Sequence, residues 1–230
     1  MVKNDPSTGK GAQTRRHIFT CALELFRENG FDATTMLDVA NRARVVKSAA
    51  YYYFPSKEAI IQAYYEVVQA EQERICDEVF AQTADLKKRL SVAMHSKFDL
   101  AKDDRGLLGV VFRYTGEPRH PLSCLGQGTK TIRQRSIAVF EQAIATENLP
   151  KDLDRLLPLA LWALQMGLLV MFLYDESPGQ QRTRKLADGS LNLTLKLVAL
   201  AKLPVFRPIR SKVLGLLSDA QLLTEDKTHG

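Results

Sequence analysis

The sequence is poor in cysteine and proline, and no stretch of it alternates apolar and polar residues between hairpin turns. Its three cysteines, Cys21, Cys76 and Cys124, lie far apart without CxxC spacing and cannot all pair within one chain, so we expect a reducing, cytoplasmic setting. Nine prolines and an apolar share of 45% suit a packed globular protein. Helical periodicity dominates, which predicts an all-α fold.

Catalytic motifs are also missing. The sequence has no GxSxG or HExxH, and His17, His120 and His229 are scattered along it. His95 and Asp99 share a predicted helix face and could bind a metal, but no third ligand follows at a suitable spacing, so a surface pair fits better. We therefore expect no enzyme activity, no metal and no cofactor.

One glycine-rich stretch keeps an alternative open. LGQGTKTI, at 125 to 132, places glycines before a predicted helix whose N–H groups could bind an anion. It lacks the full spacing of a phosphate loop and does not follow a strand, which favours a loop between helices. A helical enzyme or an anion-binding protein remains the alternative that this stretch supports.

The two ends of the chain are polar and lack periodicity, at residues 1 to 13 and 224 to 230. They are typical of loose tails. No apolar stretch follows the lysines near the N-terminus, so we expect no signal peptide. A redox role for Cys124 stays open, because the sequence does not show whether its thiol is acidic.

Positive charge is concentrated near the N-terminus. Up to residue 57 there are nine lysines and arginines against five acidic residues, which accounts for +4 of the formal charge of +6. This asymmetry suggests a polyanionic partner for the N-terminal part. A solvated basic face is the alternative.

The first 54 residues predict three short helical segments. A helix from about Thr14 to Asn29 carries Ile18, Ala22, Leu25 and Phe26 on one face and should end at Gly30, because glycine accepts a left-handed backbone. Thr35 and Asp38 match a capping box at the start of a second helix. The pattern breaks at 44 to 46 and resumes at Lys47, and two short helices separated by about three residues are typical of a helix-turn-helix.

A cluster of tyrosines closes this region, in RVVKSAAYYYFPSKEA at 44 to 59. Phe54 should turn inward while the tyrosines project from the far end. Hydroxyl and ammonium groups donate to phosphate oxygens, so the predicted phosphate-binding set comprises Lys47, Tyr51, Tyr52, Tyr53 and Lys57. An aromatic core with hydroxyls in water is the alternative, but the preceding helix-turn-helix pattern and the two lysines argue against it.

These residues carry a resemblance to a known family. The segments ELFRENGFDATTM, VANRA and YYYFPSKEA together resemble the N-terminal DNA-binding domain of the tetracycline-repressor (TetR) family of bacterial regulators. The resemblance covers residues 12 to 72. It implies a three-helix DNA-binding head, a long fourth helix, and a larger helical body at 73 to 222 that dimerises and binds a small-molecule effector.

The resemblance also implies which residues meet DNA. The helix-turn-helix would span about 35 to 54, with a recognition helix at 46 to 53 in the major groove of duplex DNA. Lys47, Ser48 and Tyr51 are candidates for base-edge or groove contacts. The candidates for holding the backbone are Thr35, Tyr52, Tyr53 and Lys57.

Some positions depart from the family pattern. Arg44 stands where the turn commonly has glycine, and a positive φ there would cost on the order of 1 kcal/mol. Val46 replaces the usual serine or threonine cap, a loss of about 1 kcal/mol. Ser48, Ala50 and Tyr53 replace the frequent glycine, leucine and histidine. We expect an altered operator preference and a recognition helix that orders fully only on DNA.

Further helices follow the head. They are expected at roughly 57 to 81, 84 to 103, 106 to 114, 128 to 147, 152 to 176, 179 to 202 and 208 to 221. The stretch 156 to 174 is apolar apart from Pro158 and Gln165 and approaches the ~20 residues that span a bilayer. Acidic residues flank it on both sides, so a helix covered by its own body and by a second copy is favoured, with no membrane partner.

The helices at 152 to 176 and 179 to 202 are the expected dimer interface. Leucines at helical spacing mark the second of them, namely Leu186, Leu193, Leu197 and Leu200. Two such helices from each copy would form a four-helix interface. A two-fold dimer that spaces its recognition helices ~34 to 36 Å apart predicts a palindromic operator.

An effector cavity would need apolar and aromatic lining, although such residues are more often plain core. The candidates are Phe98, Phe112, Tyr114, Trp162, Met166 and Phe172, with Arg113 and Gln165 as polar partners. The sequence thus predicts a ligand-responsive transcriptional repressor in which effector binding tilts the fourth helix and lowers operator affinity. A nonspecific DNA-coating or protein-interaction module is a further alternative, which selective binding to one palindrome would exclude.

Overall fold

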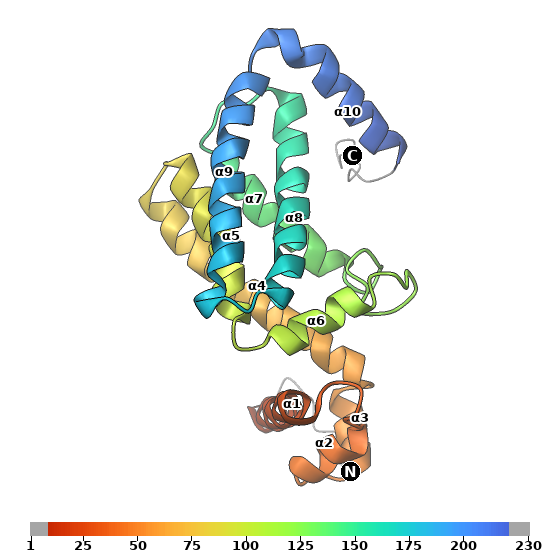
Figure 1. Cartoon of the computed structure of the whole chain (residues 1–230). Coiled ribbons are helices and arrows are strands. Elements are labelled where there is room, and N and C mark those ends of the chain that lie inside the picture. The colour runs from red at the N-terminus through yellow and green to blue at the C-terminus, as the bar shows by residue number, and fades with distance from the viewer. Residues whose placement is uncertain (1–8, 221–230) are drawn as a thin grey trace. The chain divides into compact units, whose positions relative to one another are not determined.

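The computed structural model describes residues 9–220, and in that range the chain contains helices and no strand (Figure 1). The prediction of an all-α fold is confirmed. The helices are α1 Gly9–Asn29, α2 Met36–Arg42, α3 Lys47–Tyr53, α4 Lys57–Gln82, α5 Leu86–Ala101, α6 Arg105–Arg113, α7 Lys130–Ile144, α8 Lys151–Tyr174, α9 Gln181–Ala201 and α10 Arg207–Asp219. Two short 3₁₀ turns, Pro178–Gln180 and Pro204–Phe206, precede α9 and α10.

The chain divides into two compact units. One unit comprises the chain up to Gln72 together with Lys97–Arg135, and the other comprises Glu73–Ser96 and the chain from Ser136 onward. Three long helices, α4, α5 and α7, run from one unit into the other. The first unit contains the whole helix-turn-helix.

The core of the first unit follows the predicted periodicity. Its buried residues include Ile18, Ala22, Leu25 and Phe26 on the predicted face of α1 and Phe54 after α3, as expected. Val39, Ala40, Ala43 and Ala50 are also buried, whereas Ala49 is half-buried. Gly30 ends α1 with a φ of 83°, and the Phe31 ring lies 5.4 Å from the Phe26 ring. The predicted end of the first helix is therefore confirmed in detail.

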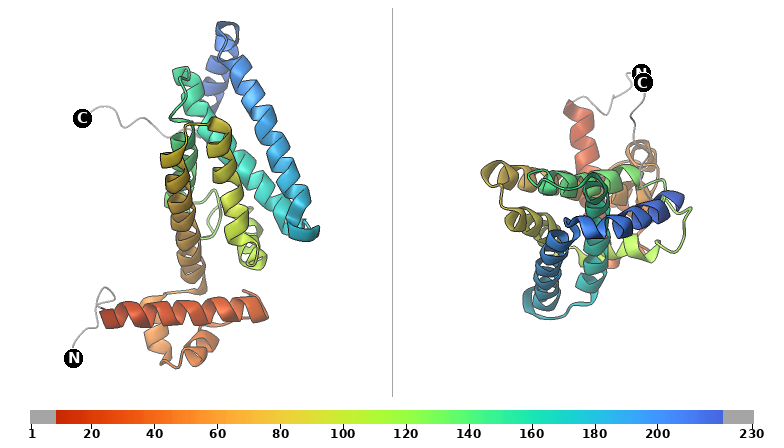
Figure 2. Two further views of the ribbon diagram at one scale, coloured as in Figure 1. Left: turned by 90° about the vertical axis from the view of Figure 1, so that its left-hand side faces the viewer. Right: turned by 90° about the horizontal axis from the view of Figure 1, so that it is seen from above.

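The predicted start of the first helix is wrong by five residues. The helix α1 begins at Gly9, whereas apolar periodicity suggested about Thr14. Its first two turns are polar, so the buried stripe that starts at Ile18 does not mark them. The left view of Figure 2 shows α1 as one straight rod beside α2 and α3.

The connection between α8 and α9 is also more elaborate than predicted. A continuous helix was expected over 179 to 202, but Gly179 and Gln180 have positive φ of 63° and 53°, and α9 starts after them. Asp175 closes this connection, because its carboxylate accepts hydrogen bonds from the backbone N–H and hydroxyl groups of Ser177 and Thr183 at 2.6 to 2.9 Å. Burial opposes ionisation of Asp175, yet these hydrogen bonds hold its pKa well below the usual value.

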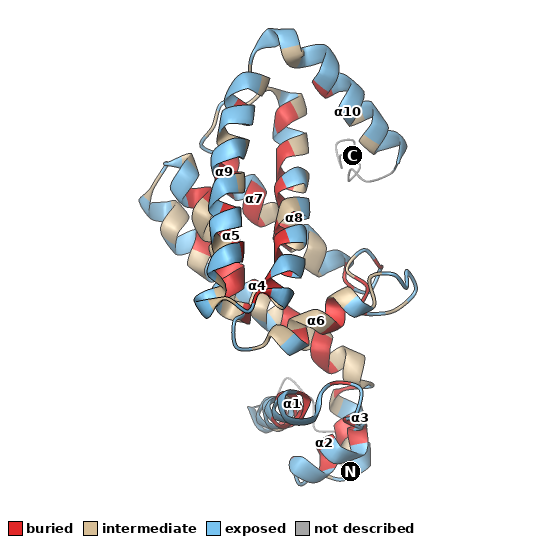
Figure 3. Cartoon of the chain, in the orientation of Figure 1, coloured by how far each residue is buried: buried red, intermediate tan, exposed pale blue. Residues whose placement is uncertain are grey.

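The helices α8 and α9 run side by side and antiparallel in the second unit (Figures 1 and 2). By length and composition α8 could cross a membrane, but 44% of its apolar window is buried inside the chain. A core helix of a soluble protein passes the same test. The outer face of α9 is largely exposed, as the pale blue ribbon in Figure 3 shows.

Candidate nucleic-acid interface

A capping box starts the first helix of the helix-turn-helix. The Thr35 hydroxyl accepts a hydrogen bond from the Asp38 N–H at 3.2 Å, and the Asp38 carboxylate accepts from the Thr35 N–H at 2.8 Å and its hydroxyl at 2.6 Å. These bonds lower the pKa of Asp38. The predicted capping box is confirmed, and the Thr35 hydroxyl is engaged in it.

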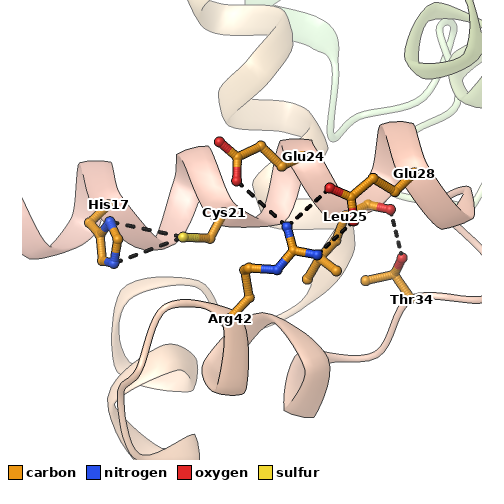
Figure 4. A network of polar contacts seen from close by, with 7 residues as sticks. All are labelled: His17, Cys21, Glu24, Leu25, Glu28, Thr34 and Arg42. Carbon is orange, nitrogen blue, oxygen red and sulfur yellow. Dashed lines mark hydrogen bonds and ion pairs between the residues drawn. The ribbon is translucent and has the colours of Figure 1, made fainter.

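Ion pairs lock α2 onto α1 (Figure 4). The Arg42 guanidinium binds both carboxylate oxygens of Glu28, at 3.1 and 2.6 Å, and lies 3.7 Å from Glu24. This pairing lowers the pKa of Glu28. The Thr34 hydroxyl adds a bond to the Gly30 carbonyl at 2.8 Å. The turn that follows therefore starts from a helix that is attached to α1 by these contacts.

The helix α3 turns its small residues inward and its polar residues outward. Ala50 is fully buried, and Phe54 at its end is 1% exposed. Lys47 and Ser48 are exposed, as are Tyr51 at 43% and Tyr52 at 56%. The predicted outward direction of the tyrosines is therefore observed for two of the three.

The third tyrosine, Tyr53, is half-buried and packs against the core of the unit. Its ring meets the Tyr52 ring edge-on, with centroids 5.1 Å apart. The Lys47 ammonium lies 5.8 Å from the centroid of the Tyr51 ring, a cation–π distance. Lysine and tyrosine donors thus lie next to each other on the outer face of α3.

Lys57 is placed differently from Lys47. Its ammonium donates to the carbonyl oxygens of Phe31 at 2.7 Å and Asp32 at 3.3 Å, and it lies 4.6 Å over the Phe31 ring. These contacts tie the start of α4 to the loop after α1. Lys57 therefore has a structural role that the sequence did not indicate, and one N–H group is left for a phosphate.

The acidic residues between 9 and 57 are all engaged within the chain. Glu24 and Glu28 meet Arg42, Asp38 caps α2, and the Asp32 carboxylate pairs with Arg113. Among the basic residues between 9 and 57, Arg27 and Arg42 have carboxylate partners. In the part of the chain that the structure describes, six basic residues from 9 to 57 have no such partner: Lys57, whose ammonium donates to two carbonyls, and Lys10, Arg15, Arg16, Arg44 and Lys47. The head therefore presents uncompensated positive charge.

Four of these cations, Lys10, Arg15, Arg16 and Arg44, were not among the predicted contact residues. The Arg15 guanidinium lies 4.6 Å over the Phe54 ring, at the C-terminal end of α3. Arg16 is exposed on the same helix. For Arg15 and Arg16, the position off the apolar stripe of α1 was the signal in the sequence, but that signal does not separate paired from unpaired cations.

Arg44 and Val46, the two residues of the turn before α3 that depart from the family pattern, have the expected structural consequences. Arg44 has a φ of 54°, and Val46 caps α3 without a side-chain hydrogen bond. Because φ is positive at Arg44, an arginine at this position raises the free energy of the folded state. The backbone N–H of Val45 still donates to the Ala40 carbonyl at 3.0 Å, which closes the turn.

The predicted effector residues lie in both units. Phe98 is fully buried, and Phe112 and Tyr114 are half-buried, in the first unit. Trp162 is 8% exposed and Met166 half-buried, in the second unit. The Tyr114 ring stacks on His120 at 3.6 Å.

The two polar residues expected near an effector have partners inside the chain. The buried Gln165 side chain donates to the Ala93 carbonyl at 2.9 Å. Arg113 is exposed and pairs with Asp32. The first contact joins α8 to α5 in the second unit, and the second joins the end of α6 to the loop after α1 in the first unit.

The glycine-rich stretch before α7 is packed against its own backbone. A Cβ at Gly128 would lie 2.5 Å from the Pro121 carbonyl oxygen, so the close approach explains this glycine. The Arg133 guanidinium donates to the carbonyls of Cys124 at 2.9 Å and Gly126 at 3.2 Å. This geometry agrees with the prediction that the glycine-rich stretch is a loop between helices.

The other alternative, a metal site, rested on His95 and Asp99. His95 pairs with Asp188 instead, with 2.8 Å between Nε2 and Oδ1, which joins α5 to α9. Within residues 9–220 no group of three or more histidine, cysteine or acidic side chains is placed to hold a metal ion.

Two family comparisons cover most of the chain. Residues 18–64 match the family described as bacterial regulatory proteins, tetR family. Residues 89–213 match the tetracyclin repressor-like C-terminal domain. The first range contains the helix-turn-helix, and the second contains more than half of the chain.

Individual relatives agree with these matches. The A-factor receptor protein of Streptomyces griseus is 39% identical over 54 residues, which are 24% of this chain and 20% of that protein. The chain thus spans a fifth of that relative's length. The transcriptional activator FasR of Mycolicibacterium smegmatis is 25% identical over 171 residues, which are 72% of this chain and 75% of that protein.

Solved structures share the fold. The transcriptional regulator FadR from Bacillus subtilis in complex with stearoyl-CoA has a TM-score of 0.60 at 19% identity, over 76% of this chain and 96% of that chain. FadR from Thermus thermophilus, a TetR-family repressor in complex with lauroyl-CoA, has a TM-score of 0.58 at 20% identity, over 82% and 95% of the two chains.

Proposed function

The chain belongs to the TetR family of bacterial regulatory proteins and is a DNA-binding transcriptional regulator, and we propose that it is a ligand-responsive repressor that binds a palindromic operator as a homodimer. The observation that carries the proposal is the outer face of the helix-turn-helix, where lysine and tyrosine donors lie beside unpaired arginines. Such a face suits the phosphates and groove of duplex DNA.

We propose distinct roles for the predicted contact residues. Lys47, Ser48 and Tyr51 lie in the first half of α3, which in helix-turn-helix proteins meets the base edges, and all three are exposed. Tyr52 and Tyr53 extend this surface toward the sugar-phosphate backbone. Thr35 and Lys57 support the contact mainly by fixing the starts of α2 and α4, since both side chains bond within the chain.

The exposed face of α9 supports the homodimer. Leu186, Leu193, Leu197 and Leu200 are 48% to 57% exposed, whereas Leu191 and Val198 on the same helix are buried. The leucines at 186, 193 and 200 recur every seven residues and therefore lie on one side of the helix. A row of large apolar side chains in water is unfavourable, so a second copy is the proposed cover.

The neighbouring helix α8 continues this apolar surface. Met171 is 55% exposed and Tyr174 is 80% exposed near its C-terminal end. Ala160, Ala163 and Gly167 are exposed along the same helix and would let a partner helix approach closely. Helices of about 152–176 and 179–202 from each copy would then form the dimer, with the recognition helices ~34 to 36 Å apart.

Membership of the TetR family is the reason to propose a small-molecule effector. We propose that it is a small molecule bound among the body helices, with Trp162 and Met166 of the second unit as candidate lining residues. Two proteins of similar fold hold acyl-CoA thioesters, so acyl-CoA compounds are the first ligands to assay. Effector binding would tilt α4 and lower operator affinity. A cytoplasmic location follows from binding chromosomal DNA.

Selection of binding sites from random duplexes with purified protein tests the proposal. A regulator should enrich one palindrome and bind it at least roughly 1,000-fold more tightly than random DNA. Recovery of unrelated sequences would support a nonspecific DNA-coating protein instead. A reporter gene controlled by the selected site then distinguishes a repressor, which lowers expression, from an activator, which raises it. The comparison is needed because the relative FasR is named an activator.

A further inference from the structure

Arg44 forms the turn between α2 and α3 with a left-handed backbone, at a φ of 54°. Residues with a side chain rarely adopt this region, because Cβ crowds the following carbonyl oxygen. Gly30 and Gly179 also have positive φ, but a glycine meets no such crowding. An arginine at this turn therefore raises the free energy of the folded state, and a glycine would not.

No contact within the described chain offsets this cost. Arg44 is exposed, and its backbone N–H donates to the Asn41 carbonyl at 3.1 Å. Between residues 9 and 220 its guanidinium has neither a hydrogen bond nor an ion pair. Arg42, two residues earlier, shows the contrast, since it pairs with Glu28. The Arg44 guanidinium keeps its charge and its N–H donors for a ligand outside the chain.

The turn places this charge beside the proposed DNA-binding face. Val46, two residues later, is the N-cap of α3, and Lys47 is the first residue of that helix. In helix-turn-helix proteins the start of the second helix enters the major groove, and the chain next to it lies near the sugar-phosphate backbone. A planar guanidinium matches two phosphate oxygens at once.

We infer that Arg44 binds a DNA phosphate at the edge of the groove that receives α3, and that this contact is the function served by the strained turn. Strained backbone at binding sites commonly has such a role. The inference rests on the proposed DNA-binding function and adds to it a residue that the sequence indicated only as a departure from a family pattern.

Two substitutions at Arg44 remove the guanidinium but differ in backbone strain. Comparing them distinguishes the effect of the phosphate contact from the effect of the strain. Arg44→Gly relieves the left-handed backbone, whereas Arg44→Ala retains its strain. Both variants should bind the selected operator roughly tenfold more weakly, and the salt dependence should fall by about one phosphate contact per protomer. Without DNA, Arg44→Gly should melt roughly 2 to 4 °C above Arg44→Ala.

Two further variants serve as controls. Arg44→Lys keeps the charge and should retain most of the salt dependence. Lys212→Ala removes one exposed cation from α10, in the other unit, and should leave operator affinity unchanged. A general effect of net charge would instead weaken binding equally in Lys212→Ala and in the two Arg44 variants.

The possible failures can be told apart. Wild-type affinity in both Arg44→Gly and Arg44→Ala would overturn the phosphate contact. A loss confined to operators with particular base pairs would also overturn it, in favour of a base-edge contact. Equal melting temperatures for the two variants would show that the left-handed backbone at position 44 does not destabilise the folded protein. If the wild-type protein selects no site from random duplexes, the DNA-binding function itself fails before any variant is compared.

Discussion

Arg27 and Asp104 form a bidentate ion pair that joins α1 to α6, with 2.6 Å between Nε and Oδ1 and 2.9 Å between Nη2 and Oδ2. The Tyr64 hydroxyl donates to the same carboxylate from α4, at 3.1 Å. One side chain therefore holds three helices of one unit. Burial and the neighbouring carboxylate raise the pKa of Tyr64, so its hydroxyl keeps the proton that it donates.

The first prediction concerns the acid sensitivity of this contact. The hydrogen bond from Arg27 lowers the pKa of Asp104 below its usual value. A carboxylate with a lowered pKa in the folded state stabilises the protein above its unfolded pKa, and this contribution is lost as the pH falls through the folded value. Asp104→Asn should therefore cost about 1 kcal/mol at pH 7, because half-exposed Arg27 is partly screened, and almost nothing once the pH is below the folded-state pKa of Asp104.

Urea unfolding at a series of pH values measures this difference. The wild-type and Asp104→Asn curves of unfolding free energy against pH should converge below about pH 4. Parallel curves over the whole range would show that the carboxylate is not ionised against Arg27 in the folded state.

The second prediction separates the two lysines of the candidate interface. Lys47 is exposed on α3, whereas the Lys57 ammonium donates to the Phe31 and Asp32 carbonyls. Lys47→Ala should lower operator affinity and reduce the salt slope by about one contact per protomer, with little change in stability. Lys57→Ala should instead lower the unfolding free energy by about 1 kcal/mol.

Fluorescence anisotropy against salt concentration, paired with urea unfolding, checks both variants. If Lys57→Ala lost affinity as Lys47→Ala did while its unfolding free energy stayed unchanged, the structural role of Lys57 would be wrong.

The third prediction concerns the missing cap of α3. Val46 has an extended backbone at φ −67° and ψ 146°, which suits an N-cap residue, but its side chain offers no acceptor. It is 70% exposed, so little apolar burial is lost on replacement. Val46→Ser should raise the unfolding free energy by about 1 kcal/mol.

Hydrogen exchange tests the same point residue by residue. Amides of 47 to 53 in the free wild-type protein should exchange faster than the central amides of α1, and operator DNA or Val46→Ser should slow them. Protection of α3 equal to that of α1 without DNA would argue against the expected ordering on DNA.

The fold could be read from the sequence to a large extent, because burial follows helical periodicity. Ile18, Leu25 and Phe26 recur on one face of α1 and are all buried. Gly30 and the Thr35 capping box act locally, so the sequence alone placed both helix ends. The start of α1 escaped prediction, since polar first turns leave no periodic trace.

The pairing of charges in the site could not be read from the sequence. Arg27 and Arg15 look alike in a helical pattern, yet Arg27 pairs with a carboxylate 77 residues away and Arg15 does not. The use of Lys57 by two carbonyls likewise depends on how the loop after α1 folds back. Contacts between distant segments decide which cations remain available to DNA.

The fourth prediction concerns the apolar face of α9. Leu193 is 57% exposed in the single chain. Leu193→Glu would place a charge in the proposed dimer interface, where its desolvation has no compensation. Sedimentation should show a monomer in place of a dimer, and operator affinity should fall because one head then binds alone.

Val67→Glu provides the matched control, since Val67 on α4 has the same exposed fraction of 57%. That variant should remain a dimer. A wild-type protein that sediments as a monomer at micromolar concentration would contradict the proposed assembly directly.

The most direct test of the DNA-binding face is the affinity of the triple variant Lys47→Ala, Tyr51→Phe, Tyr52→Phe for the operator selected by the wild-type protein. These changes remove three of the outward donors of α3, with the Ser48 hydroxyl retained, and leave the buried residues Ala50 and Phe54 intact. We expect binding weaker by roughly 100-fold, with the melting temperature unchanged. Wild-type affinity in this variant would contradict it.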